Sequence, residues 1–465
     1  MTRLIIGAMV RAIGAYPSGW RYPGAHRDPR QDAGVLRLTA RLAEEARLDY
    51  LFFGDWLATG NDLEHRDPYL VARIDPLSTI AHLAAVTDRI GLIATVDSTY
   101  ADPYTVARAT ASIDLLSGGR AGLNLVTTAD PRAAANHGVD FERVNGSRYE
   151  RAVEFETLLR RLWDSFDDDA IVADAATGRF LAPGSLHETA FRGEHVRSTG
   201  PLNVLRPVQG HLPIVRSGAS PRSQLIAAQS ADLALVAAND LAHAVSVREE
   251  LRALAFESGR DDRTLKVIAP VLPIVGETRA DAQQLADELS ELMQIVEDWP
   301  DGPPPGFPAS RSLASLSPLV GVDLTGRSPD LAVTPAIAEQ FGAAGQQLVE
   351  IVAERTGRTP GGTRPPTLRH LVVAAAVNAP IIVGSADEIA SEFETWGDAG
   401  AVDGFNVLSA VQPAQFEAFT SLVAPELVRR GVLPPAYEGE TLRDHLGLAR
   451  PESRFAYPSY AGAHI

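Results

Sequence analysis

Polar side chains stand where four short apolar runs of this sequence end. These positions are Asp55, Thr95, Asn124 and the segment 216–220. Their donors and acceptors are mostly uncharged, which suits a polar planar ring better than a metal ion. Taken singly, each also has a structural explanation: Asp55 can cap a turn, Asn124 can satisfy backbone groups, and Ser220 can cap a helix.

The segment Ser217-Gly218-Ala219-Ser220 has the composition of an anion site. Small residues before a helix leave backbone N–H groups free, and with the helix dipole these groups bind phosphate. The chain carries 42 Lys and Arg against 59 Asp and Glu, a net charge of −17. An anionic ligand must therefore be held by local donors, and neither nucleic acid nor an anionic membrane is expected as a partner.

Several other kinds of active site have no support in the sequence. The 465 residues include no cysteine, so a thiolate metal site, an iron–sulfur cluster and a cysteine nucleophile are excluded. The 11 histidines form no H-x-x-x-H pair on an expected helix, and G-x-S-x-G and P-loop motifs are absent. We predict no metal, so redox chemistry would require an organic cofactor.

The elements that must position these residues alternate between short apolar runs and amphipathic stretches. Eight strands are expected, nearly all followed by helices, near residues 4, 50, 91, 121, 213, 233, 266 and 404. This order predicts an α/β fold, a (β/α)₈ TIM barrel with insertions, whose active site lies at the carboxyl ends of the strands. A doubly wound sheet is the main alternative, but residues 9–16 contain no G-x-G-x-x-G.

We expect residues 1–465 to form a single barrel domain with three additions. Residues 165–210 break the alternation and are predicted to be an insertion. Residues 297–384, irregular up to about 365, are predicted to be a second insertion and an active-site lid, and 431–465 a C-terminal tail. No apolar run approaches the roughly 20 residues of a membrane span, and we expect a cytoplasmic protein.

Short motifs along the chain carry a family resemblance. They are Phe52-Phe53-Gly54-Asp55, Asp102-Pro103-Tyr104, Ser117-Gly118-Gly119-Arg120, Asn124-Leu125-Val126-Thr127-Thr128, Arg148-Tyr149, Ser217-Gly218-Ala219-Ser220 and Asp403-Gly404-Phe405-Asn406. In order and placement they resemble the bacterial luciferase-like flavin-dependent monooxygenases, in particular the group of nitrilotriacetate, dibenzothiophene-sulfone and long-chain alkane monooxygenases. The resemblance extends from about residue 4 to residue 450.

The resemblance implies a two-component monooxygenase. Such an enzyme uses reduced FMN from a separate flavin reductase, together with O₂, to oxygenate a small organic substrate, and it is expected to be a homodimer or homotetramer. Carried over by motif position, the cofactor-binding residues would be Asp55, Thr95, Asn124, Thr127, Thr128, Tyr149, Ser217, Gly218 and Ser220. Tyr149 and the 217–220 turn would hold the phosphate, and Asp55, Thr95 and Asn124 would lie nearer the ring.

Departures from the family pattern suggest an unusual substrate. Trp56 and Tyr16 are the candidate substrate-binding residues, and His137 and Asn124 the candidate catalytic residues. His137 has an imidazole that can donate or accept a proton near neutral pH, although a structural role explains it equally well. Arg216 either adds positive charge at the phosphate end or pairs with an acidic neighbour.

Two other functions remain open at this point. A deazaflavin-dependent oxidoreductase could use the same fold and transfer hydride without oxygen. A catalytically inactive flavin-binding protein is the alternative outside enzymology, because the histidines that many relatives carry in the first loop are replaced here by Gly14-Ala15-Tyr16.

Overall fold

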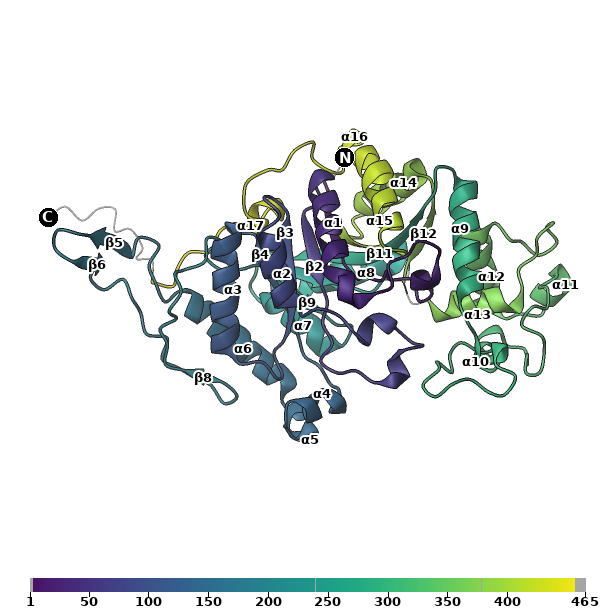
Figure 1. Ribbon diagram of the computed structural model, residues 1–465, viewed down its shortest axis with the longest axis horizontal. Coiled ribbons are helices and arrows are strands. Elements are labelled where there is room, and N and C mark those ends of the chain that lie inside the picture. Colours follow the sequence, from purple (N-terminus) through teal and green to yellow (C-terminus); the bar gives the residue numbers. More distant parts are fainter. Residues whose placement is uncertain (1–2, 239, 378, 456–465) are drawn as a thin grey trace.

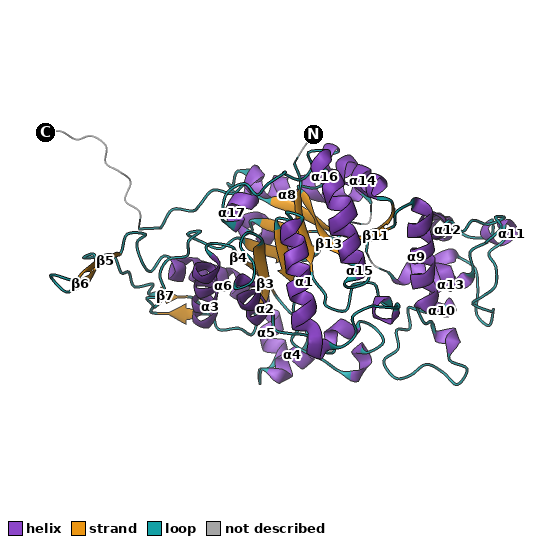
Figure 2. Cartoon of the chain, turned by 45° about the horizontal axis from the view of Figure 1, so that its top comes forward, coloured by secondary structure: helices purple, strands orange, loops and turns teal. Residues whose placement is uncertain are grey.

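A closed barrel of eight parallel strands forms the centre of the chain (Figures 1 and 2). The computed structural model describes residues 3–238, 240–377 and 379–455. The barrel strands are β1 (Ile5–Met9), β2 (Tyr50–Phe53), β3 (Gly91–Asp97), β4 (Ala121–Val126), β9 (Ile214–Ser217), β10 (Leu233–Leu235), β11 (Lys266–Val275) and β13 (Gly404–Leu408). Each pairs in parallel with its neighbours, and the pairing of β10 with β11 closes the barrel. The predicted (β/α)₈ barrel is confirmed.

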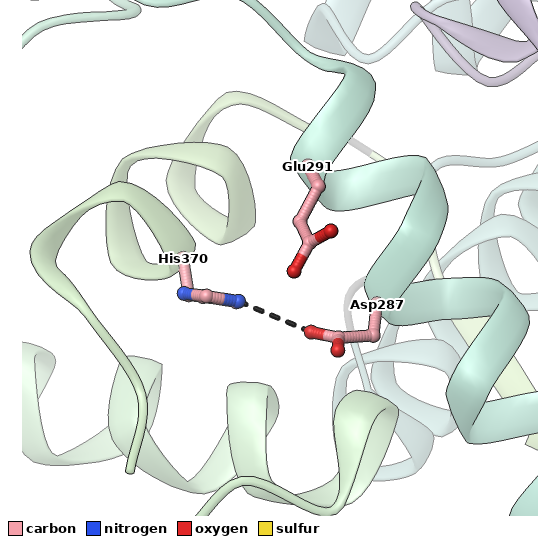
Figure 3. Close-up of side chains that lie close together, drawn as sticks. All are labelled: Asp287, Glu291 and His370. Atoms are coloured by element: carbon pink, nitrogen blue, oxygen red, sulfur yellow. Dashed lines mark hydrogen bonds and ion pairs between the residues drawn. The ribbon is translucent and has the colours of Figure 1, made fainter. Parts of the chain in front are cut away.

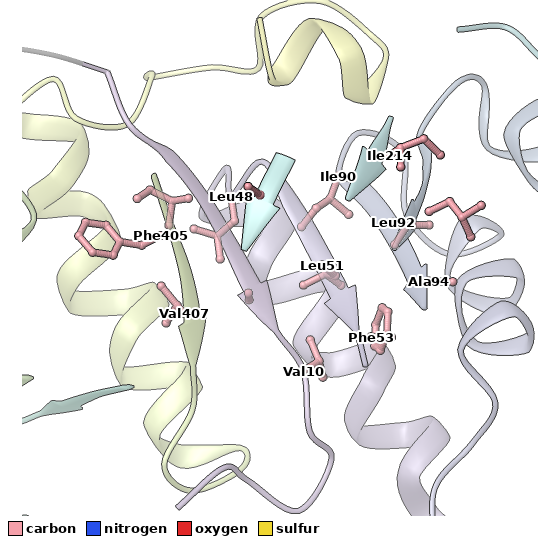
Figure 4. Close-up of a cluster of buried hydrophobic side chains, with 14 of the residues drawn as sticks. Val10, Leu48, Leu51, Phe53, Ile90, Leu92, Ala94, Ile214, Phe405 and Val407 are labelled. Carbon is pink, nitrogen blue, oxygen red and sulfur yellow. The ribbon is translucent and has the colours of Figure 1, made fainter. Parts of the chain in front are cut away.

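Helices cover the outside of the barrel. They are α1 (Asp32–Glu45), α2 (Pro76–Ala84), α3 (Pro103–Ser117), α6 (Arg148–Trp163), α7 (Pro221–Ser230), α8 (Leu241–Glu257), α9 (Arg279–Leu292), α14 (Ala386–Asp398), α15 (Ala414–Ala418) and α16 (Ala424–Arg429). Two short helices, α4 (Pro131–Asn136) and α5 (Phe141–Gly146), lie between β4 and α6 in the chain, at the bottom of Figure 1. Outward-facing strand residues such as Leu51, Leu92 and Phe405 are buried against these helices (Figure 4). This apolar layer fixes where each strand ends.

Capping residues mark the starts of several helices. Asp102 caps α3, with its carboxylate accepting from the Thr105 N–H at 2.8 Å. In the sequence, Ser385 followed three residues later by Glu388 predicts a capping box, and this box begins α14. Ser147 and Glu150 have the same spacing and predict another capping box, but that prediction is wrong. The Ser147 hydroxyl makes no cap bond to α6 and instead donates to the Arg143 carbonyl oxygen at 3.3 Å.

The predicted C-terminal tail is in part a plug of the barrel. The short helix α17 (Leu442–His445) places Leu442 and Leu446 among barrel-lining side chains that include Tyr50 and Ile93. Gly91 leaves the necessary room, because a Cβ there would lie 2.4 Å from Leu442. The segment therefore closes the end of the barrel opposite to the carboxyl ends of the strands. Residues 456–465 of the predicted tail lie outside the described residues.

The predicted insertion at 165–210 contains two small hairpins. They consist of β5 (Ile171–Asp174) with β6 (Arg179–Leu181), and β7 (Phe191–Arg192) with β8 (Arg197–Ser198). The first hairpin projects from the body of the molecule, at the left of Figure 1.

The segment 297–384 is more regular than the sequence suggests. It contains α10 (Leu313–Val320), α11 (Pro335–Ala338), α12 (Ala343–Thr356), α13 (Leu368–Ala376) and the strand β12 (Ile381–Gly384). These helices have an apolar core of their own, and β12 extends the sheet along the far half of β11. The prediction of an irregular stretch up to about 365 was wrong, because short helices separated by proline and glycine show little periodicity.

An ionic cluster fastens this segment to α9 (Figure 3). The Asp287 carboxylate accepts from Arg358 at 2.6 and 2.7 Å, from Arg364 at 2.6 Å and from His370 Nε2 at 3.1 Å. Burial would raise the pKa of Asp287, but these hydrogen bonds hold it well below its usual value. Glu291, His370 and Asp287 could together face a cation. Two guanidinium groups already neutralise Asp287, so we assign the cluster an anchoring role.

None of the described helices has both the length and the apolar character that a membrane span requires.

Candidate functional site

A cleft of about 370 Å³ opens at the carboxyl ends of the barrel strands. We call it the barrel cleft. Its lining residues are Met9, Arg11, Phe52, Gly54, Asp55, Thr95, Asn124, Val126, Ser217, Gly218, Ala219, Leu235, Val236, Ala237, Pro270 and Asn406. Five of the predicted cofactor-binding residues are among them: Asp55, Thr95, Asn124, Ser217 and Gly218. They converge because the strands that carry them are parallel and end at one edge.

Buried amides at the cleft wall have unused hydrogen-bonding capacity. The Asn124 amide nitrogen donates to the Thr95 hydroxyl at 2.9 Å, across the β3–β4 pair. Its oxygen is buried and has no partner among the described residues, and the same is true of both amide atoms of Asn406. Buried polar atoms without partners are costly, so these three atoms favour a polar ligand in the cleft.

Asp55 has a partner that the sequence did not reveal. Arg73, from the loop before α2, lies 3.1 Å from the Asp55 carboxylate and also donates to the Trp56 carbonyl oxygen. Burial raises the pKa of Asp55 to about 6, against the opposing charge of Arg73 and with help from Asp75 and Asp97. The Asp55 carboxyl therefore titrates close to neutral pH at the mouth of the cleft.

Tyr149 and Ser220 meet outside the cleft lining, where Ser220 is next in the chain to Ala219, which lines the cleft. The two hydroxyl oxygens lie 3.2 Å apart, and Ser223 lies within 3.5 Å of Tyr149 and 2.8 Å of Ser220. Ser220 caps α7 by accepting from the Ser223 N–H at 3.2 Å. Three hydroxyl groups and the start of a ten-residue helix therefore face one another, which is the composition of a phosphate site.

Positive charge is available beside these hydroxyl groups. The guanidinium of Arg148 lies 4.4 Å from the centre of the Tyr149 ring and donates to the Tyr149 hydroxyl at 3.3 Å. Arg148 forms no ion pair with the described carboxylates. Hydrogen bonds from Ser220 and Ser223 hold the pKa of Tyr149 below its usual value.

Gly218 occupies a position that only glycine fits well. Its φ of +134° lies in the region that other residues rarely adopt, and a Cβ there would lie 2.8 Å from the Cβ and hydroxyl of Ser223. The bare backbone lets the 217–220 turn approach a ligand closely.

Arg216 does not contribute its charge to this cluster of hydroxyl groups. Its guanidinium is buried and donates to Glu156 at 2.7 Å. Although burial alone would raise the pKa of Glu156, the charges of Arg216 and Arg160 lower it to about 2. Of the two roles expected for Arg216, the structure shows the ion pair.

Other predicted site residues lie outside the cleft lining. Thr127 and Thr128 follow Val126, which lines the cleft, and are half-buried. Trp56 is 40% exposed at the rim. His137 is exposed at the end of α4, where its ring stacks on Tyr100 with centroids 4.8 Å apart. The roles predicted for these residues remain predictions.

Tyr16 lines a second cavity, of about 250 Å³, which we call the side hollow. Its lining residues are Arg11, Ile13, Gly14, Ala15, Tyr16, Pro17, Trp20, Arg66, Asp67, Pro68, Leu272, Ala376, Val377, Ala379 and Leu408. Arg11 lines both cavities, so they are neighbours. The side hollow is bounded on one side by the 297–384 segment, through Ala376, Val377 and Ala379.

The sequence missed four residues of the site. Asn406, Arg73, Arg148 and Ser223 are not among the predicted site residues, although three of them stand in or next to the quoted motifs. Asn406 and Arg148 could have been noted as polar residues at a strand end and beside a predicted phosphate ligand. Arg73 lies in a loop without any periodic signal, and only the folded chain brings it to Asp55.

The chain is similar to known monooxygenases in sequence and in fold. The family described as luciferase-like monooxygenase matches residues 18–403. Nitrilotriacetate monooxygenase component A of Aminobacter aminovorans is 35% identical, over 98% of both chains. N-acetyl-S-(2-succino)cysteine monooxygenase of Bacillus subtilis (strain 168) is 32% identical, over 97% of this chain and 98% of the other. Among solved structures, DmoA from Hyphomicrobium sulfonivorans superposes with a TM-score of 0.77 at 25% identity, covering 96% of this chain and 92% of that one.

The family match spans more than half of the chain, and these relatives align along nearly its full length. The family predicted from the motifs is confirmed, and with it the prediction of a monooxygenase. The chain belongs to the luciferase-like monooxygenase family.

Proposed function

We propose that this chain is the oxygenating component of a two-component system that uses reduced FMN and O₂. The observation that carries the proposal is the barrel cleft, which has unpartnered buried amides in its wall and is lined by Ser217, Gly218 and Ala219. These three residues lead directly into a cluster of hydroxyl groups at a helix start. FMN has two matching parts: a ring with polar edges, and a phosphate at the end of its side chain.

The phosphate end would be formed by Tyr149, Ser220 and Ser223, with Arg148 supplying positive charge. These donors are local, which matters in a chain of net charge −17. The backbone N–H groups at the start of α7 add to them. Gly218 would let the 217–220 turn lie against the ligand.

The ring end would be formed by Asp55, Thr95, Asn124 and Asn406. The Asn124 oxygen and the Asn406 amide have free hydrogen-bonding capacity for the polar edge of a ring. When bound, the reduced flavin supplies the reaction with O₂, placing one oxygen atom on the substrate and the other in water. The protein's part is to orient the ring, hold the substrate beside it and exclude water.

We assign the substrate to the side hollow, where Tyr16 and Trp20 are among the lining residues. Residues 297–384 would act as a lid over it. Trp299 and Phe307 pack on His65, with ring centroids 6.5 and 5.7 Å apart, and so fasten the proline-rich stretch to the loop that carries Arg66. One relative is named component A, which supports a second protein component as partner, and we assign the role of flavin reductase to that component.

An anaerobic titration with reduced FMN tests the proposal. We expect tight binding to wild-type protein, followed by consumption of O₂ when air is admitted. A matched titration with a reduced deazaflavin is expected to give weaker binding. Selective binding of the deazaflavin would overturn the proposal.

A further inference from the structure

The side hollow continues the barrel cleft along two strands. Pro270 and Asn406 line the cleft, whereas Leu272 and Leu408, each two residues further along β11 and β13, line the hollow. Arg11, just beyond the end of β1, lines both. Side chains two residues apart point to the same side of a strand, about 6.6 Å apart. A molecule in the hollow therefore lies directly beside whatever occupies the cleft.

The wall of the hollow is apolar over most of its extent. It is formed by Ile13, Trp20, Leu272, Ala376, Val377 and Leu408. Such a wall favours a compact hydrocarbon or aromatic skeleton, because burial of apolar surface is the main favourable contribution to binding.

Charge in the lining is unbalanced in favour of cations. Two guanidinium groups, of Arg11 and Arg66, share the lining with one carboxylate, that of Asp67. Arg11 pairs with Asp67 at 2.7 Å. The Arg66 side chain makes no hydrogen bond or ion pair within the described residues, so its guanidinium is available to a ligand.

Two further arginines lie behind this lining without carboxylate partners in the part of the chain that the structure describes. Arg311 is 8% exposed and donates to the Arg66 carbonyl oxygen at 3.2 Å. Arg355 lines a small cavity on the far side of Tyr16, and the charges of both arginines act on the Tyr16 hydroxyl. Burial lowers the pKa of both arginines, which shows that their charge is poorly solvated.

Cations that are desolvated and unpaired are unfavourable unless an anion compensates them. Arg311 is buried and Arg355 half-buried, whereas Arg66 is exposed and Arg11 is paired with Asp67. In a chain of net charge −17, the gathering of these four arginines around one apolar hollow is not explained by the overall composition. A ligand with an anionic group would supply the missing charge.

We propose that the substrate is an organic acid, with a carboxylate bound by Arg66 and Arg11 in the side hollow and its apolar part against Trp20 and Leu272. Arg66 makes the direct ion pair, and Arg11 contributes from its position between the two cavities. Arg311 and Arg355 stabilise the anion through the field that they add behind Tyr16. The proposal rests on the proposed function for the identity of the occupant of the barrel cleft.

Matched pairs of acid and amide test this assignment. We would measure binding of hexanoate, hexanamide, phenylacetate and phenylacetamide by calorimetry at low salt, with and without oxidised FMN. In each pair the two molecules have nearly the same shape and differ in charge. At least one acid is expected to bind wild-type protein about tenfold more tightly than its amide, a preference that weakens as salt is added.

Variants of Arg66 make the test specific. Arg66→Gln is expected to remove the preference for the acid, and Arg66→Lys to restore part of it. Arg327→Gln is the matched control, because Arg327 is an exposed arginine of the 297–384 segment that lines neither cavity. It should keep the full preference.

Two results would overturn the inference: amides that bind wild-type protein as tightly as the acids, or an Arg66→Gln protein that still prefers the acid. Failure of FMN to bind would count against the proposed function alone, because the preference for acids is also measured without FMN.

Discussion

The hydroxyl oxygens of Tyr149 and Ser220 lie 3.2 Å apart, although 71 positions separate the two residues in the chain. Tyr149 is in the first turn of α6 and Ser220 caps α7, so two helices that follow different barrel strands present their starts to one point. We propose that this pair of hydroxyl groups, of which that of Ser220 is next in the chain to the cleft-lining residue Ala219, binds a phosphate group. Ser220 is therefore the residue to change in a test of phosphate binding.

Ser220→Glu is expected to lower the affinity for reduced FMN by about 100-fold or more, because the added carboxylate crowds and repels the phosphate. The affinity of the same variant for reduced riboflavin, which lacks the phosphate, should fall much less. Fluorescence-monitored titrations of both flavins would measure the difference. Ser385→Glu is the control, since it removes the cap of α14, which is not part of the cleft, and should leave both affinities unchanged. Equal FMN affinity in wild type and Ser220→Glu would refute the placement of the phosphate.

Gly218→Ala is expected to weaken FMN binding about tenfold, because the new Cβ would strain the backbone and displace Ser223. Gly431→Ala provides a comparison in which φ is also positive, +73°, but the space around the position is open. Both variants should lose some stability, measured by thermal unfolding. Only Gly218→Ala should have a reduced affinity for FMN. If FMN affinity fell equally in both variants, the effect would be due to general destabilisation.

The affinity for FMN should depend on pH through Asp55, whose pKa is raised to about 6. Above this pH the carboxylate is charged and can accept hydrogen bonds, whereas below it the group is neutral, so affinity should fall as pH decreases through about 6. Arg73→Gln removes a charge that lowers this pKa, and the fall should move to higher pH by about one unit.

Asp75→Asn should shift the pH dependence of FMN affinity in the opposite direction. Asp75 raises the pKa of Asp55, so its neutralisation should move the fall to lower pH, while asparagine still caps α2. Asp55→Asn should abolish the transition. If both charge variants shifted the profile in the same direction, Asp55 would not be the group that titrates.

Deletion of residues 301–305, within the proline-rich stretch, should increase the hydrogen peroxide released per reduced FMN consumed. The stretch is fastened to the loop at 61–67 through Trp299, Phe307 and His65, and its loss should admit water to the side hollow. Peroxide and oxygenated product would be quantified in single turnovers with a substrate of the wild-type enzyme. Shortening the exposed turn at 175–178 should leave the ratio unchanged, and an unchanged ratio in both deletions would exclude a lid at 297–384.

The fold could be predicted because its signals are local. Each barrel strand is a short apolar run followed by an amphipathic helix, and starts such as Asp102-Pro103 and Ser385 with Glu388 are marked by their capping residues. Ser147 has the same signal without the capping bond, since its hydroxyl turns back to Arg143. The helices α10, α11 and α12 of the 297–384 segment were missed because proline and glycine interrupt the pattern there.

From strand order, only those site residues could be predicted to meet that stand at the ends of neighbouring parallel strands. Asp55, Thr95 and Asn124 meet because parallel strands end together, whereas Arg73 reaches Asp55 from a loop. His137 carries suitable chemistry, but the structure places it on Tyr100 outside the cleft lining. Its catalytic role stays a prediction. Side-chain direction and loop paths depend on tertiary packing, which residue type and spacing do not specify.

The most direct test of the central claim is the affinity of the wild-type chain for reduced FMN, compared under anaerobic conditions with reduced riboflavin and a reduced deazaflavin. We predict that FMN binds at least about tenfold more tightly than riboflavin, because its phosphate is held by Tyr149, Ser220, Ser223 and Arg148. We also predict that FMN binds more tightly than the deazaflavin. Equal affinities for FMN and riboflavin, or selective binding of the deazaflavin, would contradict the central claim.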